Sequence, residues 1–542
     1  MDAITTPPVP VNEPVRSYAP GSSERETLAA KLRELSAAPI ELTMTIDGQQ
    51  RMAAGQRIEV VAPHRHEQLL GATAQATVPD VEAAIGAALR AAPAWRDLPF
   101  DERAAVFLRA ADLLCTTWRD TLNAATMLGQ SKTAYQAEID AACELADFLR
   151  FNVHFARQIR EEQPISATGI WNRMDYRPLE GFVLAITPFN FTAIAGNLPS
   201  APAMLGNVVV WKPSPTQQLA AHWTMRLFEA AGLPPGVINL VTGDGGAVSE
   251  AALTHPMLAG IHFTGSTPTF QTLWRAVGNA LGSYASYPRL VGETGGKDFV
   301  VAHVSADPAA LVTALVRGAF EYQGQKCSAA SRAYVPRSLW TNGVRDELAA
   351  VTQSLSYGDV TDFSHFGGAV IDRRAFDRLS SIQEQLAADS SATVLAGGKS
   401  DDSVGFFVQP TVFECTVADH DVFRREYFGP LLAVHVYEDR DWDGMLTQME
   451  SVSPYALTGS VFARERAVVN DVSQRLRFAA GNFYVNDKPT GAVVGQQPFG
   501  GARASGTNDK AGSMWNLIRW ASPRSIKETF TPPTDYRYPH QG

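Results

Sequence analysis

The chain has 542 residues, of which 45% are hydrophobic and 19% are charged, and its formal net charge is −10 at pH 7. This length is about three to four times that of a typical domain, so we expect at least two lobes. The charge is moderately negative and spread along the chain, which argues against a role in binding nucleic acids. No apolar run approaches the roughly 20 residues that a membrane-spanning helix needs.

The cysteines and the N-terminus suggest a compartment. The four cysteines, Cys115, Cys143, Cys327 and Cys415, lie far apart and form no CxxC pair. This spacing favours reduced thiols over a disulfide framework or a metal site. Residues 1–20 are rich in proline and show neither an apolar signal segment nor an Arg-rich amphipathic pattern. We therefore expect a cytoplasmic protein whose first 23 residues form a poorly ordered or wrapping arm.

The first half of the chain begins with helical patterns. We predict helices over residues 80–92, with Asp80 as the N-cap, over 101–114, and over 131 to about 160.

From Gly181 onward, short apolar strands alternate with helical stretches. The predicted strands cover residues 182–187, 208–211, 237–241 and 260–264. Repeated strand, turn and helix indicate an α/β fold with a doubly wound parallel sheet, which binds ligands at the carboxyl ends of its strands. A second α/β alternation runs from residue 299 to about 485 and includes a strand at 431–437, which predicts a second lobe.

Two residues carry the strongest chemical signal. Cys327 lies in the run Gly-Gln-Lys-Cys-Ser, and Glu293 begins the run Glu-Thr-Gly-Gly-Lys. A thiolate can attack a carbonyl carbon and later leave from a thioester, and a carboxylate in a glycine-lined turn can deprotonate the water that hydrolyses it. Together they predict covalent oxidation of an aldehyde.

Polar residues follow the predicted strands. Asn190 offers an amide donor to an oxyanion, and Lys212 places a cation where hydroxyls or phosphates could bind. The turn at Gly265 and Ser266 precedes a helix and would expose backbone N–H groups to a pyrophosphate. The standard GxGxxG loop is absent.

A later motif supplies two further groups for a dinucleotide. Glu426 provides a carboxylate for a ribose, and Phe428 provides a ring for one face of a nicotinamide.

In this order, these motifs resemble the aldehyde dehydrogenase superfamily from about residue 46 to about residue 527. The motifs are Pro188-Phe189-Asn190, Lys212-Pro213-Ser214, Phe263-Thr264-Gly265-Ser266, Glu293-Thr294-Gly295-Gly296-Lys297, Gly324-Gln325-Lys326-Cys327 and Glu426-Tyr427-Phe428-Gly429-Pro430. Within the superfamily, the segments 189–197, 322–328 and 483–501 resemble the Δ1-pyrroline-5-carboxylate dehydrogenases, which oxidise glutamate γ-semialdehyde.

The resemblance implies an aldehyde dehydrogenase-like α/β fold with a Rossmann-like NAD-binding lobe, a catalytic lobe and a β-flap for oligomerisation. The expected boundaries are 24–163 with 181–298 for the NAD-binding domain, 164–180 with 512–542 for the flap, and 299–511 for the catalytic domain. It also implies a homodimer or a higher oligomer built from dimers, with a proline dehydrogenase as a candidate upstream enzyme.

The resemblance assigns roles position by position. Cys327 resembles the nucleophile, Glu293 the general base, and Asn190 with the Cys327 N–H the oxyanion hole. The NAD contacts it implies are Thr187, Pro188, Phe189, Lys212, Ser214, Gly265, Ser266, Glu426 and Phe428. The substrate contacts it implies are Glu144, Phe191, Lys326, Ser328, Gly491, Ala492 and Phe499. No metal is expected.

Two positions depart from the family pattern. Pro215 follows Ser214 where many members have a Glu that binds the adenosine ribose, which weakens the preference for NAD over NADP. Phe270 replaces the usual Gly at the end of the Phe-Thr-Gly-Ser loop, so the helix start there could differ in shape.

Simpler readings remain for five of the predicted site residues. Cys327 could be a buried core thiol, Glu293 a solvated turn carboxylate and Lys212 a surface charge after a strand. Glu144 shares a helical stripe with Asp140 and Asp147, as on a solvated face, and Asn190 could merely cap the next helix.

The predicted function is the NAD-dependent oxidation of L-glutamate γ-semialdehyde, which forms from Δ1-pyrroline-5-carboxylate, to glutamate in proline catabolism. The alternatives are another semialdehyde dehydrogenase, such as one for succinate semialdehyde, and a non-enzymatic structural or regulatory protein of the same fold.

Overall fold

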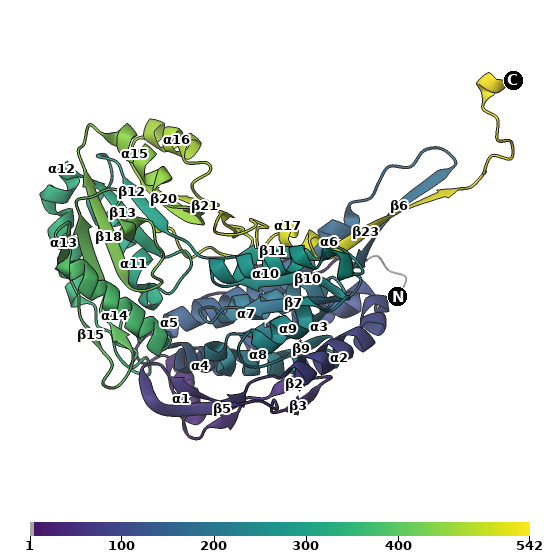
Figure 1. Ribbon diagram of the computed structural model, residues 1–542, viewed down its shortest axis with the longest axis horizontal. Helices are drawn as coiled ribbons and strands as arrows, with labels where there is room; N and C mark the ends of the chain where they lie inside the picture. The colour runs from purple at the N-terminus through teal and green to yellow at the C-terminus, as the bar shows by residue number, and fades with distance from the viewer. Residues whose placement is uncertain (1–4) are drawn as a thin grey trace.

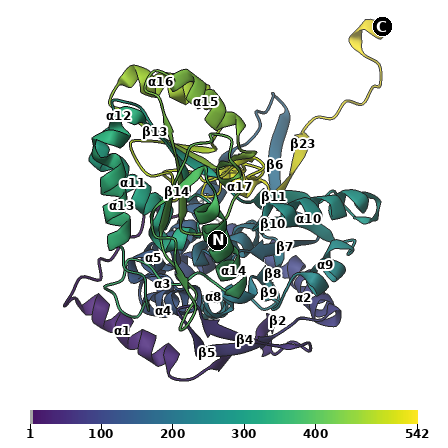
Figure 2. The ribbon, with the colours of Figure 1, turned by 60° about the vertical axis from the view of Figure 1, so that its left-hand side comes forward.

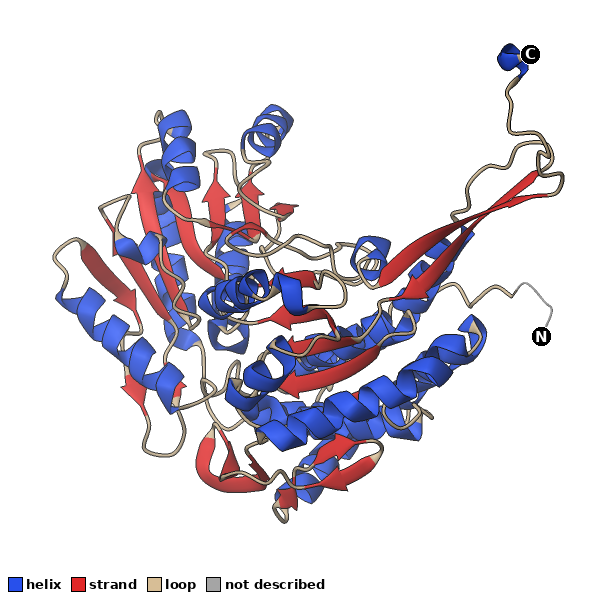
Figure 3. Cartoon of the chain, turned by 45° about the vertical axis from the view of Figure 1, so that its right-hand side comes forward, coloured by secondary structure: helices blue, strands red, loops and turns tan. Residues whose placement is uncertain are grey.

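The computed structural model describes residues 5–542, so the first four residues of the predicted N-terminal arm lie outside the described part. It contains two seven-stranded sheets, and a two-stranded antiparallel sheet projects from the body (Figure 1). Helices flank both large sheets (Figure 3). None of the helices within residues 5–542 combines the length and the apolar character needed to cross a membrane.

The first sheet has the order β11-β10-β7-β8-β9-β2-β3. Its strands are β2 Met44–Ile46, β3 Gln49–Arg51, β7 Phe182–Thr187, β8 Val208–Pro213, β9 Ile238–Leu240, β10 Leu258–Thr264 and β11 Arg289–Glu293. Neighbours from β11 to β9 run parallel, which confirms the predicted doubly wound sheet. The chain moves from β7 to β8 and β9 and then returns to place β10 on the other side of β7. A ligand crevice is therefore expected between the ends of β7 and β10.

Helices cover this sheet and share one apolar core with it. They are α2 Val78–Asp97, α3 Phe100–Cys115, α4 Arg119–Gln130, α6 Leu145–Glu161, α7 Thr192–Met204, α8 Gln218–Ala230, α9 Gly246–Leu253 and α10 Thr267–Asn279. The prediction that Asp80 is an N-cap is wrong, because α2 begins at Val78 after the N-cap Thr77. Asp80 instead accepts a hydrogen bond from the Thr77 backbone N–H at 3.0 Å, as the third residue of a capping box.

The single long helix predicted over 131–160 is broken. Ser131 ends α4 in a left-handed conformation with φ 55°. The chain then forms α5 (Ala134–Ala137), a π-helical segment (Glu138–Glu144) and α6. Such π segments change which side chains face the core, and they occur frequently at functional sites.

The second sheet has the order β14-β17-β18-β13-β12-β20-β21 and confirms the predicted second α/β region. Its strands are β12 Asp298–Ala302, β13 Ala330–Pro336, β14 Ala392–Ala396, β17 Thr411–Cys415, β18 Leu431–Tyr437, β20 Thr458–Phe462 and β21 Asn482–Val485. All neighbours pair in parallel except β14 with β17.

Both faces of the second sheet are buried. On β12, Phe299 and Val301 belong to one apolar cluster, and Val300 and Ala302 belong to another. Alternate residues of a strand face opposite sides, so this division shows that helices cover each side. Helices α14 (Arg373–Ala388), α15 (Trp442–Ser451) and α16 (Arg466–Arg475) cover the first, and α11 (Pro308–Phe320) and α13 (Arg345–Ser354) the second.

The N-terminal segment wraps around the first lobe. The Glu13 carboxylate lies 2.6 Å from Arg119 and 2.7 Å from Arg150, and Tyr18 is buried. Helix α1 (Ser23–Ser36) follows it.

At the other end, β6 (Ile170–Pro178) pairs antiparallel with β23 (Ala521–Thr529) to form the projecting two-stranded sheet (Figure 2). The remaining short elements are β1 Ile40–Glu41, β4 Arg57–Ala62, β5 Arg65–Ala74, β15 Ser400–Asp401, β16 Phe407–Val408, β19 Tyr455–Ala456, β22 Ala502–Arg503, α12 Arg337–Leu339 and α17 Met514–Ile518.

Candidate active site

A strained loop carries Cys327 from α11 towards β13. Tyr322, Gln323 and Gly324 have consecutive positive φ angles of 50°, 53° and 62°. The Gln323 side chain holds the loop by donating to the carbonyl oxygens of Ser131 at 2.9 Å and Ala369 at 2.7 Å. Non-glycine residues keep such angles only when their surroundings fix them, and strain of this kind clusters at active sites.

The Cys327 thiol is poorly disposed to ionise in this structure. Although its side chain still contacts the cavity, burial raises its pKa well above 9.0, and the Asp298 and Glu293 carboxylates raise it further. The thiol therefore holds its proton until a base removes it.

Glu293, the last residue of β11, lies in a cradle of glycines. Its Oε2 accepts a hydrogen bond from the Gly501 N–H at 2.8 Å. A Cβ at Gly500 would lie 3.1 Å from Oε1, and a Cβ at Gly506 would lie 3.1 Å from Oε2. Burial raises the pKa of this carboxyl well above 4.5, which suits a group that takes a proton near neutral pH. These glycines come from residues 500–506, outside the Glu-Thr-Gly-Gly turn.

Asn190 is aimed at the cysteine loop. Its buried side-chain amide donates to the Gln325 carbonyl oxygen at 3.0 Å. The simpler reading of Asn190 as a helix cap is wrong, because the Asp140 carboxylate accepts from the Thr192 and Ala193 N–H groups at the start of α7, at 2.9 and 2.8 Å. An amide beside the thiol can serve as an oxyanion donor.

Polar groups lie at the carboxyl ends of β8 and β10, namely Lys212 near the end of β8 and Ser266 just after β10. Lys212 is 93% buried, and its ammonium forms no ion pair with any residue in the described range 5–542. Burial lowers its pKa to about 8. Ser266 caps α10, and its Oγ accepts from the Thr269 N–H at 3.3 Å. A buried ammonium and a helix N-terminus at a topological switch point suit a phosphate-bearing dinucleotide such as NAD.

The two departures from the expected pattern have local explanations. Phe270 faces the core, where its ring stacks on Phe263 at 5.3 Å, and Gly292 leaves it room, since a Cβ there would lie 2.3 Å from the ring. Helix α10 therefore starts normally. Pro215 begins a 3₁₀ turn (Pro215–Gln217) that leads into α8.

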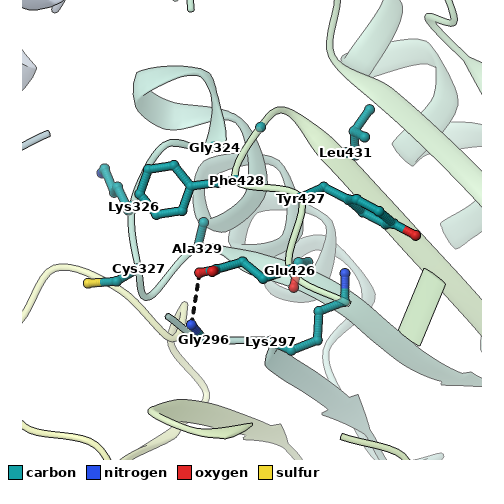
Figure 4. A pocket seen from close by; sticks show the side chains of 12 residues that line it. Gly296, Lys297, Gly324, Lys326, Cys327, Ala329, Glu426, Tyr427, Phe428 and Leu431 are labelled. Carbon is teal, nitrogen blue, oxygen red and sulfur yellow. Dashed lines mark hydrogen bonds between the residues drawn. The ribbon is translucent and has the colours of Figure 1, made fainter. Parts of the chain in front are cut away.

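Further groups expected to contact NAD line a cavity with the cysteine (Figure 4). The Glu426 carboxylate accepts from the Gly296 N–H at 2.9 Å, and burial raises its pKa to about 7. Phe428 has φ 58° and meets Phe189 edge-on at 5.7 Å. In the close view, the Cys327 side chain points away from Glu426. The Cys327 thiol and the Glu426 carboxylate, which is the predicted ribose contact, thus lie on different sides of one cavity.

The sequence comparisons agree with this geometry. The model of the aldehyde dehydrogenase family matches residues 51–526. The chain belongs to the aldehyde dehydrogenase family.

Relatives that match this chain along nearly its whole length indicate a narrower group within the family. The chain is 51% identical over 533 residues, 97% of each chain, to a probable delta-1-pyrroline-5-carboxylate dehydrogenase of Schizosaccharomyces pombe. It is 62% identical, with a TM-score of 0.97 and complete coverage of both chains, to the Delta-pyrroline-5-carboxylate dehydrogenase of Mycobacterium tuberculosis in a crystal structure bound with NAD. It also matches proline utilization A of Bdellovibrio bacteriovorus at 30% identity and a TM-score of 0.91, over 98% of this chain and 55% of that one.

The comparisons overturn one expectation. Relatives from Bos taurus and Homo sapiens are named as mitochondrial enzymes. The prediction of a cytoplasmic location is therefore wrong. It rested on the pattern of residues 1–20 and on cysteine spacing, neither of which distinguishes the cytosol from another reducing compartment.

In this aldehyde dehydrogenase, one residue predicted to bind the substrate meets a segment that is distant in sequence. The Ser328 hydroxyl lies 2.8 Å from the Thr490 hydroxyl, next to Gly491, whose φ is 93°. The Lys326 ammonium lies 3.1 Å from the Glu321 carboxylate. Of the other predicted contacts, Ala492 adjoins Gly491, Phe499 pairs with Ala511 in an isolated bridge, and Phe191 is the N-cap of α7.

Glu144 does not belong to a solvated face. Asp140 and Asp147 of the same stripe are buried, Asp140 in an ion pair of 2.7 Å with Lys132 and Asp147 beneath the N-terminal segment. Burial, aided by Asp140, raises the pKa of Glu144 to about 8. A carboxyl of this kind fits a pocket, and its contact with the substrate remains a prediction.

Sequence reasoning missed several charged residues of the aldehyde dehydrogenase site. The Lys132 ammonium lies 4.2 Å from the Phe191 ring centre and 4.5 Å from that of Tyr322. Lys510 lies near Glu293, and burial lowers its pKa. No local pattern marks these lysines, because their partners are distant in sequence. Within residues 5–542, no cluster of His, Cys, Asp and Glu is arranged to hold a metal ion.

Proposed function

We propose that this chain is an NAD-dependent L-glutamate γ-semialdehyde dehydrogenase, which converts the open form of Δ1-pyrroline-5-carboxylate to glutamate. The main support is the presence of Cys327 near a partly buried Glu293 in a chain that is similar along its whole length to proteins named for this activity.

The first step forms a bond between Cys327 and the substrate. The Cys327 thiol gives up its proton, and the sulfur attacks the aldehyde carbon to form a hemithioacetal whose oxygen carries the negative charge. The Asn190 amide and the Cys327 N–H stabilise that oxygen. The thiol proton passes to solvent water, so Glu293 remains a carboxylate for the hydrolysis step.

NAD, when bound, accepts a hydride from the former aldehyde carbon, which leaves a thioester on Cys327. The residues proposed to hold it are Lys212 and Ser266 for the ribose and pyrophosphate, and Glu426 and Phe428 for the nicotinamide half.

The last step hydrolyses the thioester. The Glu293 carboxylate removes a proton from a water molecule, the resulting hydroxide attacks the acyl carbon, and the Cys327 thiolate leaves as glutamate forms. Because this step needs a carboxylate and a nearby thioester, the glycine cradle that orients Glu293 is part of the proposed machinery.

The rival substrate is succinate semialdehyde, which lacks the α-ammonium group. The residues predicted to contact the substrate include more polar side chains than that substrate needs. They are Ser328, which contacts Thr490, Lys326, which contacts Glu321, and Glu144. The site does not favour a non-enzymatic role, since the proposed nucleophile Cys327 and the proposed base Glu293 are both present.

We further propose a homodimer assembled through the two-stranded sheet of β6 and β23. This sheet projects from the body, and it and the chain beyond it expose large apolar side chains, including Trp171 at 51%, Phe530 at 61% and Tyr536 at 90%. Deleting residues 530–542 should weaken the dimer in analytical ultracentrifugation, and an unchanged dimer would count against this arrangement. A proline dehydrogenase is the proposed upstream enzyme, because oxidation of proline yields pyrroline-5-carboxylate.

A burst experiment tests the assignment of the base. With pyrroline-5-carboxylate, Glu293→Gln should give one equivalent of NADH rapidly and then turn over at least about tenfold more slowly than the wild type, because hydrolysis loses its base. The exposed Glu102→Gln is the matched control and should behave as the wild type. Wild-type turnover in Glu293→Gln would exclude Glu293 as the base.

A further inference from the structure

Lys510 lies near Glu293 and has a backbone conformation that is uncommon for a residue other than glycine. It is half-buried and adopts φ 55°, and Asn508 two residues earlier has φ 57°. Left-handed non-glycine residues are uncommon and persist when the surrounding structure holds them. The segment 506–510 is therefore fixed in one conformation, and the direction of the lysine side chain is fixed with it.

The ammonium of Lys510 binds only uncharged oxygens. It donates to the carbonyl oxygens of Gly481 at 2.8 Å and Gly500 at 3.1 Å, and it lies 3.4 Å from Asn482 Oδ1. Within residues 5–542 it forms no ion pair. Asn482 Oδ1 also accepts from the Gly500 N–H at 3.1 Å, so Lys510 and Asn482 together hold Gly500.

The contacts that fix Gly500 also fix the position of the Glu293 carboxylate. Gly501, the next residue, donates its N–H to Glu293 Oε2 at 2.8 Å, and Gly500 leaves no spare room beside Oε1. Lys510 is thus connected to the carboxylate through one turn of backbone.

Few charged groups face Glu293. Lys510 supplies a positive charge that lowers the Glu293 pKa against the effect of burial. Asp509 acts in the opposite direction, but its Oδ1 is paired with Arg519 at 2.5 Å. Burial raises the pKa of the Cys327 thiol well above 9.0, so this residue adds no positive charge near Glu293. Among the groups with the largest effects on the pKa of this carboxyl, Lys510 is therefore the cation.

We propose that Lys510 is a positioning residue for Glu293, one that fixes the Gly500–Gly501 turn and keeps the carboxylate charged in the water-activating position. This inference rests on the proposed role of Glu293 as the base. It assigns to Lys510 an effect on thioester hydrolysis and none on the formation of the thioester.

Two substitutions in the full chain separate charge from packing. Lys510→Gln keeps a hydrogen-bond donor without the charge, and Lys510→Arg keeps the charge. For each, the NADH burst and the steady-state rate with pyrroline-5-carboxylate are measured between about pH 6 and pH 10. The exposed Lys399→Gln is the matched control.

In Lys510→Gln, the burst should be unchanged, which also shows that the protein is folded. The acid limb of the steady-state rate should move to higher pH by about one unit, with about tenfold slower turnover below that limb, because Glu293 is deprotonated only at higher pH. Lys510→Arg should stay within about twofold of the wild type.

An unchanged acid limb in Lys510→Gln, together with a normal burst, would overturn the proposal. A Lys510→Arg variant as defective as Lys510→Gln would also overturn it, since the positive charge would then be irrelevant. Glu293→Gln measured in parallel isolates the underlying assumption. If that variant hydrolyses the thioester at the wild-type rate, the assignment of the base fails rather than the role of Lys510.

Discussion

At the residue scale, Cys327 must lose a proton that its surroundings help it keep. Burial and the carboxylates of Asp298 and Glu293 hold the pKa of the thiol well above 9.0 in the free protein. Free cysteine is an effective nucleophile because a few per cent of it is thiolate at neutral pH, and this environment lowers that fraction. The structure therefore favours a thiol that becomes reactive only during turnover.

This environment makes a prediction for chemical labelling. Iodoacetamide should label Cys327 slowly at pH 7, and the rate should keep rising with pH beyond about pH 9, because alkylation requires the thiolate. Peptide mass spectrometry should locate the label, since Cys115 is also partly exposed, and Cys327→Ser identifies the background. A labelling rate that is already maximal at pH 7 would show that the thiol is ionised in the free protein.

At the element scale, the start of α7 depends on a buried ion pair. Asp140 of the π-helical segment accepts from two backbone N–H groups of α7 and pairs with Lys132 at 2.7 Å. The Lys132 ammonium in turn lies over the ring of Phe191, a predicted wall of the substrate pocket. One carboxylate therefore links helix capping to the shape of the site.

Removing that carboxylate should be costly. Asp140→Ala leaves Lys132 buried without a counterion, so the free energy of unfolding should fall by about 3–5 kcal/mol. Chemical denaturation measures this change, and the exposed Asp101→Ala is the control. A loss below about 1 kcal/mol would mean that water or another group replaces Asp140.

The elements differ in how well the sequence predicts them. Strands β7 and β18 have the predicted bounds, because buried parallel strands are continuous apolar runs that end at turn residues. The π segment was not predicted, since its sequence has ordinary helical periodicity and its extra residue is stabilised by contacts from α7 and the N-terminal segment.

At the scale of the whole molecule, the site is assembled from segments of both sheets and of the loops that follow them. Glu293 ends a strand of the first sheet, Cys327 precedes a strand of the second, and residues 500–510 return to hold Glu293. Motif order singles out Cys327 and Glu293 as the candidate nucleophile and base, and these two roles stay predictions. It could not predict Lys510 or the burial of Glu144, because both depend on contacts between distant segments.

The central claim is that this pocket oxidises glutamate γ-semialdehyde in preference to simpler aldehydes. Polar groups left without partners in a buried site cost about 1–3 kcal/mol each, which corresponds to about tenfold to a hundredfold in kcat/KM. The direct test compares kcat/KM for NADH formation from pyrroline-5-carboxylate, succinate semialdehyde and a simple aliphatic aldehyde, in the wild type and in Ser328→Ala. We expect at least about a tenfold preference for pyrroline-5-carboxylate in the wild type and a smaller preference in the variant. Equal kcat/KM for all three aldehydes in the wild type would contradict the account and leave a general aldehyde dehydrogenase.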